Sequence, residues 1–161
     1  MKTLYKQYWP LFVLIAVAIL GSTALTYGAQ KSLFEWMHFF MGLFLSQFAM
    51  LKLFHISDFV HGFQKYDLVA KKSVYYAYAY PFIELGLGLA YLSFVYPFAI
   101  YVITIVVMSI GAIGVIRALK AGLDVRCACM GTVLDVPLST VTLSEDISMI
   151  TMAIFMLLSI I

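Results

Sequence analysis

Residues 98–119 read FAIYVITIVVMSIGAIGVIRAL, and Arg117 is the one charged residue in this stretch. An α-helix that crosses a bilayer needs about 20 mostly apolar residues to span a hydrocarbon core of about 30 Å. The stretch has that length and carries a single charge near its end. The sequence therefore predicts a membrane-spanning helix here.

Four further apolar stretches of similar length occur at about residues 9–27, 36–54, 73–94 and 143–161. Residues of the AVILMFWYC set make up 64% of the chain and charged residues 11%, with a mean hydropathy of +1.01. Soluble domains carry about 25% charged residues, and so little charge cannot cover a water-facing surface. This excludes a disordered chain, a soluble enzyme and a soluble nucleic-acid binder. We expect an all-α membrane protein in the lipid bilayer, a compact bundle of four to five transmembrane helices, with five favoured, that forms one domain over residues 1–161.

The ten basic residues are distributed unevenly between the predicted loops. If the N-terminus is cytoplasmic, nine of them lie on the cytoplasmic side and Lys31 alone lies outside. Basic residues concentrate in the cytoplasmic loops of membrane proteins. We therefore expect a multi-pass protein with the N-terminus and the loop after the fourth helix in the cytoplasm. The membrane we expect for it is the bacterial cytoplasmic (inner) membrane.

The segment of residues 54–72 is too polar to span the membrane but has helical periodicity. Its apolar side carries Phe59, Phe63 and Ala70, and its polar side carries His55, Asp58, His61 and Lys65. We expect a short interfacial helix on the cytoplasmic membrane surface. The spacing of His55, Asp58 and His61 also permits shared metal ligation, because imidazole and carboxylate are ordinary ligands. The alternative is that these three form the solvated face of the helix.

The chain contains two cysteines, one residue apart, in Cys127-Ala128-Cys129, and Met130 follows them. The cytoplasm disfavours a structural disulfide, and a ring closed across one residue is strained. Strained, accessible disulfides exchange readily. Two adjacent thiolates can also hold a soft ion such as Cu(I) or Hg(II), with Met130 as a further ligand. A third interpretation is two small buried residues without reactivity.

Glu84 lies close to the middle of the third apolar stretch. A charged residue at that depth costs about 2.5–3.5 kcal/mol on insertion scales, so we expect it to face the interior of the bundle. Ser46 and Gln47 lie at matching depth in the second stretch and can hydrogen-bond a protonated carboxyl. Two interpretations stay open: a proton or cation site, and a protonated acid that holds helices together.

A start signal precedes the last apolar stretch. Thr142 and Glu145 stand in the T-x-x-E relation of a capping box, and Glu145 and Asp146 would then lie in the first turn, where the helix dipole favours acids. The sequence therefore predicts that the last helix begins near Thr142.

From about residue 40 to the end, the chain resembles a known family. The stretch HGFQKYDLVAKKSVYYAYAYPFIELGLGLAYL at residues 61–92, then CACMGT and VPLSTVTLSEDISM, resembles the methylamine-utilisation protein MauE and its DoxX-like, redox-associated relatives. The resemblance implies a compact helical bundle with a role near thiol chemistry. MauE is linked to methylamine metabolism and the maturation of a disulfide-rich periplasmic dehydrogenase subunit, and relatives accompany glutaredoxin-like or heavy-metal-binding domains. The residues that match the family motifs are Cys127, Cys129, Glu84, Pro81, Tyr66 and Asp67.

The leading hypothesis is a small membrane thiol-redox accessory protein, in which Cys127 and Cys129 exchange with a partner and assist its redox maturation. The chain has no soluble thioredoxin-like or metal-binding domain, so such a partner is expected to be a separate thioredoxin-like, glutaredoxin-like or metal-binding protein. Any catalysis would be limited to thiol–disulfide exchange. The first alternative is a heavy-metal carrier of the mercury or copper type, with Cys127, Cys129 and Met130 as ligands of Cu(I) or Hg(II). The second alternative is a structural subunit of a membrane complex.

Overall fold

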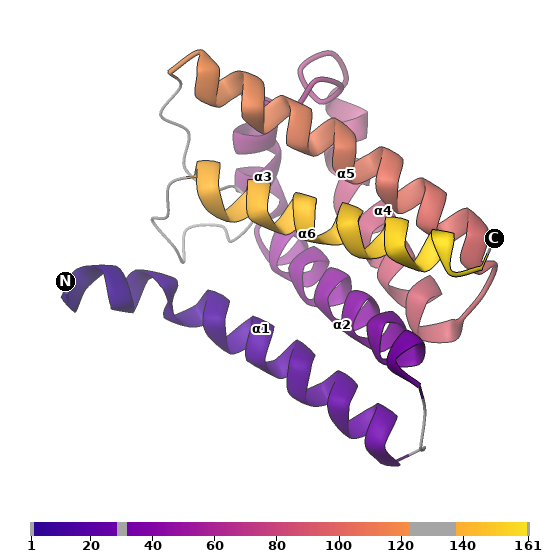
Figure 1. Cartoon of the computed structure of the whole chain (residues 1–161). Coiled ribbons are helices and arrows are strands. Elements are labelled where there is room, and N and C mark those ends of the chain that lie inside the picture. Colours follow the sequence, from indigo (N-terminus) through magenta and orange to yellow (C-terminus); the bar gives the residue numbers. More distant parts are fainter. Residues whose placement is uncertain (1, 29–31, 123–137, 161) are drawn as a thin grey trace.

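The structure is a computed structural model, and it describes residues 2–28, 32–122 and 138–160. The regular structure in these ranges is entirely helical, which confirms the all-α class (Figure 1). The helices are α1 (Lys2–Gly28), α2 (Leu33–Phe54), α3 (Ile56–Phe63), α4 (Val74–Ser93), α5 (Pro97–Lys120) and α6 (Leu138–Leu158).

Five of these helices are long, and they correspond to the five apolar stretches of the sequence. Within the described residues, three are long and apolar enough to cross a membrane: α1 over Trp9–Gly28, α2 and α5. Tyrosines and Glu84 lower the apolarity of α4. The chain is a helical membrane protein, and a full crossing by α4 and α6 stays a prediction.

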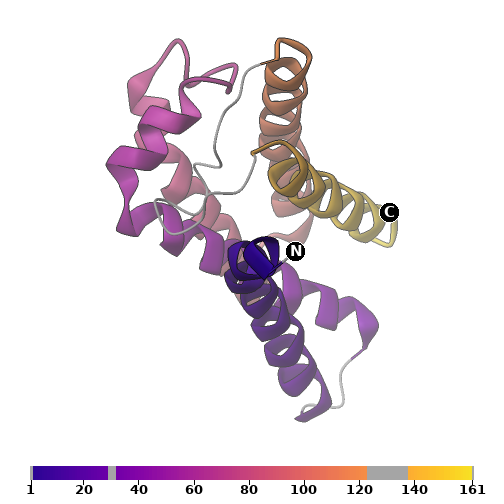
Figure 2. The same ribbon diagram turned by 90° about the vertical axis from the view of Figure 1, so that its left-hand side faces the viewer.

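The long helices are arranged around two extensive packing interfaces. α2 packs along α4, and α5 packs along α6, while α1 packs against the outer side of α2 (Figures 1 and 2). At one end of the bundle, α2 and α5 end, α4 and α6 begin, and the short α3 lies across α4. We call this the α3 end.

Glycines bring α2 and α4 close together. A Cβ added to Gly88 would lie 2.5 Å from the Ser46 side-chain oxygen and 2.9 Å from the Ser46 backbone nitrogen. A Cβ on Gly42 would lie 2.9 Å from the Gly88 carbonyl oxygen. Small residues at such positions allow membrane helices to pack backbone against backbone. The close packing holds Lys52 of α2 and Glu84 of α4 in fixed relation.

The polar segment after α2 forms a helix, as its periodicity predicted. The backbone leaves the helical conformation at His55, whose φ is −131°, and α3 follows directly. The predicted apolar side is buried, with Phe59 and Phe63 in the core beside Ala70. The predicted polar side is exposed, and it carries His55, Asp58, His61 and Lys65. The helix ends at Phe63, and turns connect it to α4.

The predicted start of the last helix is wrong by about one turn. α6 begins at Leu138 rather than near Thr142. Residues 138–141 are already helical, so the capping pattern at Thr142 does not mark the first turn. Thr142 and Asp146 therefore lie inside the helix and are buried. This change turns Asp146 from an acid that stabilises a helix start into a buried carboxylate that contacts α5.

Candidate functional site

A buried ion pair joins α2 to α4 near the α3 end. The Lys52 ammonium donates to both carboxylate oxygens of Glu84, at 2.6 Å to Oε1 and 2.5 Å to Oε2. The two side chains are 4% and 1% exposed. Lys52 lies in the last turn of α2, where the helix dipole favours a cation. A buried charge is tolerated only when it is paired, and this pair neutralises both partners.

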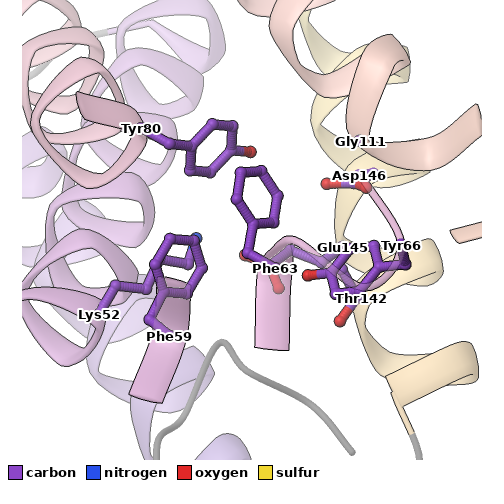
Figure 3. Close-up of a pocket in the computed structure, with 9 residues that line it drawn as sticks. All are labelled: Lys52, Phe59, Phe63, Tyr66, Tyr80, Gly111, Thr142, Glu145 and Asp146. Carbon is purple, nitrogen blue, oxygen red and sulfur yellow. The ribbon is translucent and has the colours of Figure 1, made fainter. Parts of the chain in front are cut away.

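Aromatic rings surround the ammonium group of Lys52. Its nitrogen lies 5.3 Å from the ring centroid of Tyr80 and 5.8 Å from that of Phe59, within the range of cation–π attraction. Phe63 packs against both rings, at centroid distances of 4.6 Å from Tyr80 and 4.9 Å from Phe59. α3 therefore contributes two buried phenylalanines to the aromatic wall beside Lys52 (Figure 3).

A small cavity separates Lys52 from the first turns of α6. It is lined by Lys52, Phe59, Phe63, Tyr66, Tyr80, Gly111, Thr142, Glu145 and Asp146 (Figure 3). Its free volume is about 10 Å³, which is the lower limit for one water molecule. The cavity therefore has room for water-sized occupants only.

Asp146 is the most unusual group in this cavity. The residue is 5% exposed, and its Oδ2 atom has no hydrogen-bond partner. Gly111 of α5 faces it, and a Cβ there would lie 3.2 Å from Oδ2. Glycine at this position therefore leaves space beside the carboxylate.

The turn after α3 brings Tyr66 and Asp67 to the same region. A Cβ on Gly114 would lie 2.9 Å from the Tyr66 carbonyl oxygen, so this glycine lets the turn pack directly on α5. Oδ1 of Asp67 accepts hydrogen bonds from the backbone N–H groups of Val69 and Ala70, at 2.9 and 2.8 Å. Burial nevertheless raises the pKa of Asp67 above its ordinary value, because the backbone donors only partly offset the loss of solvation.

A second buried polar group lies toward the other end of α2. His38 is fully buried, and its Nε2 lies 2.5 Å from the Tyr101 hydroxyl oxygen on α5. Its Nδ1 lies 3.2 Å from the Tyr91 carbonyl oxygen on α4, and Phe94 stacks on its ring at 4.4 Å. Both ring nitrogens have partners, so this histidine links three helices.

The residues predicted from the sequence are only partly brought together. Glu84 faces the bundle interior as predicted, but the predicted partners were wrong. Lys52 binds Glu84, whereas the side-chain oxygens of Ser46 and Gln47 have no hydrogen-bond partner. The reason is that Lys52 lies close enough to neutralise an ionised carboxylate, so a neutral donor is not required.

The polar face of α3 shows no convergence on a metal ion. His55, Asp58 and His61 are exposed, and His61 Nδ1 lies 2.9 Å from the backbone oxygen of Ser57. Across the described ranges, no group of three or more His, Cys, Asp or Glu side chains is arranged to hold a metal. Cys127, Cys129 and Met130 lie outside the described residues.

Sequence reasoning missed Lys52, Asp146 and His38 as site residues. A signal existed for Lys52, because it lies inside the second apolar stretch, as Glu84 lies inside the third. Opposite charges within neighbouring antiparallel spans indicate pairing. Asp146 was obscured by the capping pattern, and the hydrogen-bond partners of His38 lie far from it in the sequence, at Tyr91 and Tyr101.

These features define the class: a helical membrane protein with a charged, water-sized cavity near one end of its bundle. The family model of the methylamine utilisation protein MauE matches residues 30–161, a range that includes α2 to α6 and both cysteines. The chain belongs to the MauE family. No curated protein and no solved structure matches it.

Proposed function

We propose that this membrane protein of the methylamine-utilisation type acts in thiol-redox maturation, with Cys127 and Cys129 as the exchanging pair. The observation that supports this most is that the family match spans both cysteines of the chain, which lie one residue apart. Arg126 precedes the pair, and a neighbouring cation favours the reactive thiolate form.

The proposed reaction is a reversible exchange with a disulfide of a separate thioredoxin-like or glutaredoxin-like protein. The thiolate of one cysteine attacks a sulfur of that disulfide, forms a mixed disulfide and releases one partner thiolate. The second cysteine thiolate then attacks the mixed disulfide and releases the other partner thiolate. Two electrons pass to the partner, and Cys127 and Cys129 become a strained disulfide that reacts readily in the reverse direction.

We further propose that the chain is a multi-pass protein of the inner membrane, with the α3 end in the cytoplasm. The segment that carries the cysteines connects Lys120, the last residue of α5, to Leu138, the first of α6. Both helix ends belong to the α3 end. The positive-inside rule puts nine of the ten basic residues in the cytoplasm when the N-terminus is cytoplasmic, and this supports the orientation. The cavity with Lys52 and Asp146 lies near the same end.

The second candidate is a heavy-metal carrier. Met130 directly follows the cysteine pair, and two thiolates with a thioether suit Cu(I) or Hg(II). A structural subunit of a membrane complex is the third candidate, and it requires no reactivity from the thiols.

The deciding experiment is elemental analysis and free-thiol quantification on protein purified without oxygen. The exchange proposal predicts two free thiols, no stoichiometric metal, and loss of disulfide exchange with a thioredoxin in Cys127→Ser and Cys129→Ser. Met130→Leu is the matched control, because it should lower metal binding and leave exchange unchanged. Stoichiometric copper or mercury would support the carrier. Cellular function that survives replacement of both cysteines would contradict both chemical proposals.

A further inference from the structure

The buried charges around the cavity do not balance within the described residues. Lys52 carries one positive charge, whereas Glu84 and Asp146 together carry two negative charges when ionised. Both carboxylates are at least 95% buried, since Glu84 is 1% and Asp146 5% exposed. An ionised carboxylate without compensation is very costly in a medium of low dielectric constant, and such a group takes up a proton instead.

The geometry identifies which carboxylate lacks compensation. Both oxygens of Glu84 accept hydrogen bonds from Lys52. Oδ2 of Asp146 has no partner, and the side chain lines the cavity from the α6 side (Figure 3). An unpaired buried polar atom in a native structure requires an explanation such as a bound water, an ion or a proton.

The surroundings of Asp146 favour a proton over a metal ion. The free volume of about 10 Å³ admits one water but no hydrated cation. The described part of the chain also provides no set of three metal-ligating side chains at this place. The groups that can titrate or carry charge near Asp146 are Lys52 of α2, Glu84 and Tyr80 of α4, Glu145 of α6, and Tyr66 and Asp67 of the turn after α3, while α5 contributes Gly111.

We propose that Asp146 is a proton-binding site, in which the carboxyl holds a proton at neutral pH and exchanges it through one water in the cavity. The Lys52–Glu84 pair determines whether Asp146 holds its proton, because a lysine that is paired with Glu84 cannot fully neutralise the carboxylate of Asp146 as well. The site resembles a buried acid of a proton relay in its chemistry, and it would give the bundle a charge that changes with pH. This inference is independent of the thiol proposal, since neither cysteine takes part.

Infrared difference spectroscopy on the full chain in phospholipid nanodiscs tests the site. A protonated carboxyl has a carbonyl stretch that is absent from a carboxylate and shifts in D2O. We expect the wild type to show such a band at neutral pH, and Asp146→Asn to lack it. Asp58→Asn is the matched control, because Asp58 is an exposed acid on α3 and its replacement should leave the band unchanged.

A second variant keeps the test decisive if Asp146→Asn does not fold. Gly111→Ala retains the acid but places a methyl group about 3.2 Å from Oδ2, so less water can solvate the ionised form. We expect the band to persist to higher pH than in the wild type. Absence of the band at neutral pH in the wild type would overturn the proposal. Its disappearance on addition of sodium or calcium at constant pH would also overturn it, because a cation would then be the occupant.

Discussion

Lys52 and Glu84 form the buried ion pair that joins α2 to α4. Each is charged, and each lies in a helix whose other residues are largely apolar. Removal of one partner of a buried pair leaves the other charge uncompensated, whereas removal of both can be nearly neutral. An ionic Lys52–Glu84 pair therefore predicts that each single variant is less stable than the double variant. A neutral hydrogen bond at Glu84 does not predict this difference.

We expect Lys52→Met and Glu84→Gln each to destabilise the folded protein by about 3–5 kcal/mol, the usual loss for breaking a buried pair. The double variant Lys52→Met/Glu84→Leu should recover much of that loss. Thermal unfolding in detergent, followed by circular dichroism, measures the three variants. If Glu84→Gln is as stable as the wild type, Glu84 is neutral in the folded protein and the pair is not ionic.

The stability of the folded protein should depend on pH through Asp67. Burial raises its pKa above the ordinary value of 3.8, so the folded state holds the proton more tightly than the unfolded state. Its contribution to stability is complete below 3.8 and is lost as the pH rises through the folded value. We expect Asp67→Asn to remove this decline, since the amide oxygen can still accept from Val69 and Ala70. Unfolding midpoints measured from acid to neutral pH test this.

The control for Asp67 is an acid that lies outside the packed region. Asp58 is exposed on α3, so Asp58→Asn should keep the wild-type dependence on pH. An Asp67→Asn variant with the same pH dependence as the wild type would show that the pKa of Asp67 does not differ between the folded and unfolded states.

At the scale of single elements, the α2–α4 contact can be tested with two glycines of one helix. A Cβ on Gly88 meets backbone and side-chain atoms of Ser46, whereas a Cβ on Gly86 meets nothing within 4 Å. Overpacking costs about 1–3 kcal/mol, and replacing a helical glycine by alanine returns about 1 kcal/mol of propensity.

We therefore expect Gly88→Ala to lower the unfolding midpoint and Gly86→Ala to leave it unchanged or raise it. Because the nearest backbone atoms of α2 cannot rotate away as a side chain can, the two helices must separate in Gly88→Ala. Equal midpoints for the two variants would mean that α2 and α4 are not in close contact at Gly88.

The elements themselves were largely predictable, whereas the contacts between them were not. The apolar stretches located the five long helices, and the alternation of Phe59 and Phe63 with exposed polar residues located α3. Periodicity reports which side of a helix is buried but not which residue faces it. For this reason Glu84 was placed correctly in the interior and assigned to Ser46 and Gln47 instead of Lys52.

The start of α6 shows a different limit of sequence reasoning. The T-x-x-E pattern at Thr142 is a local signal, but helix boundaries are the least reliable part of a sequence-based assignment, and α6 starts at Leu138. The earlier start of α6 gives Asp146 a different environment from the predicted one. The acid lies inside the helix, buried beside Gly111, and not in the first turn. A local pattern cannot register an effect of tertiary packing between two helices.

At the scale of the whole molecule, the distribution of basic residues predicts the orientation in the membrane. If the N-terminus is cytoplasmic, the order of the predicted spans puts nine of the ten on the cytoplasmic side and Lys31 alone outside. The turn between α4 and α5 then faces the opposite compartment, since α4 and α5 run in opposite directions. This orientation also places the segment with Cys127 and Cys129 in the reducing compartment.

We expect a thiol reagent that cannot cross membranes to label Cys127 and Cys129 in inside-out vesicles and not in intact cells. A matched reporter is Val95→Cys in a chain with both native cysteines changed to serine. Val95 is 47% exposed in the turn between α4 and α5, so its label should appear in intact cells. The two measurements must give opposite results if α5 spans the membrane. Labelling of the native pair from outside the cell would reverse the orientation, and the argument that those thiols rest in the reduced state would fail with it.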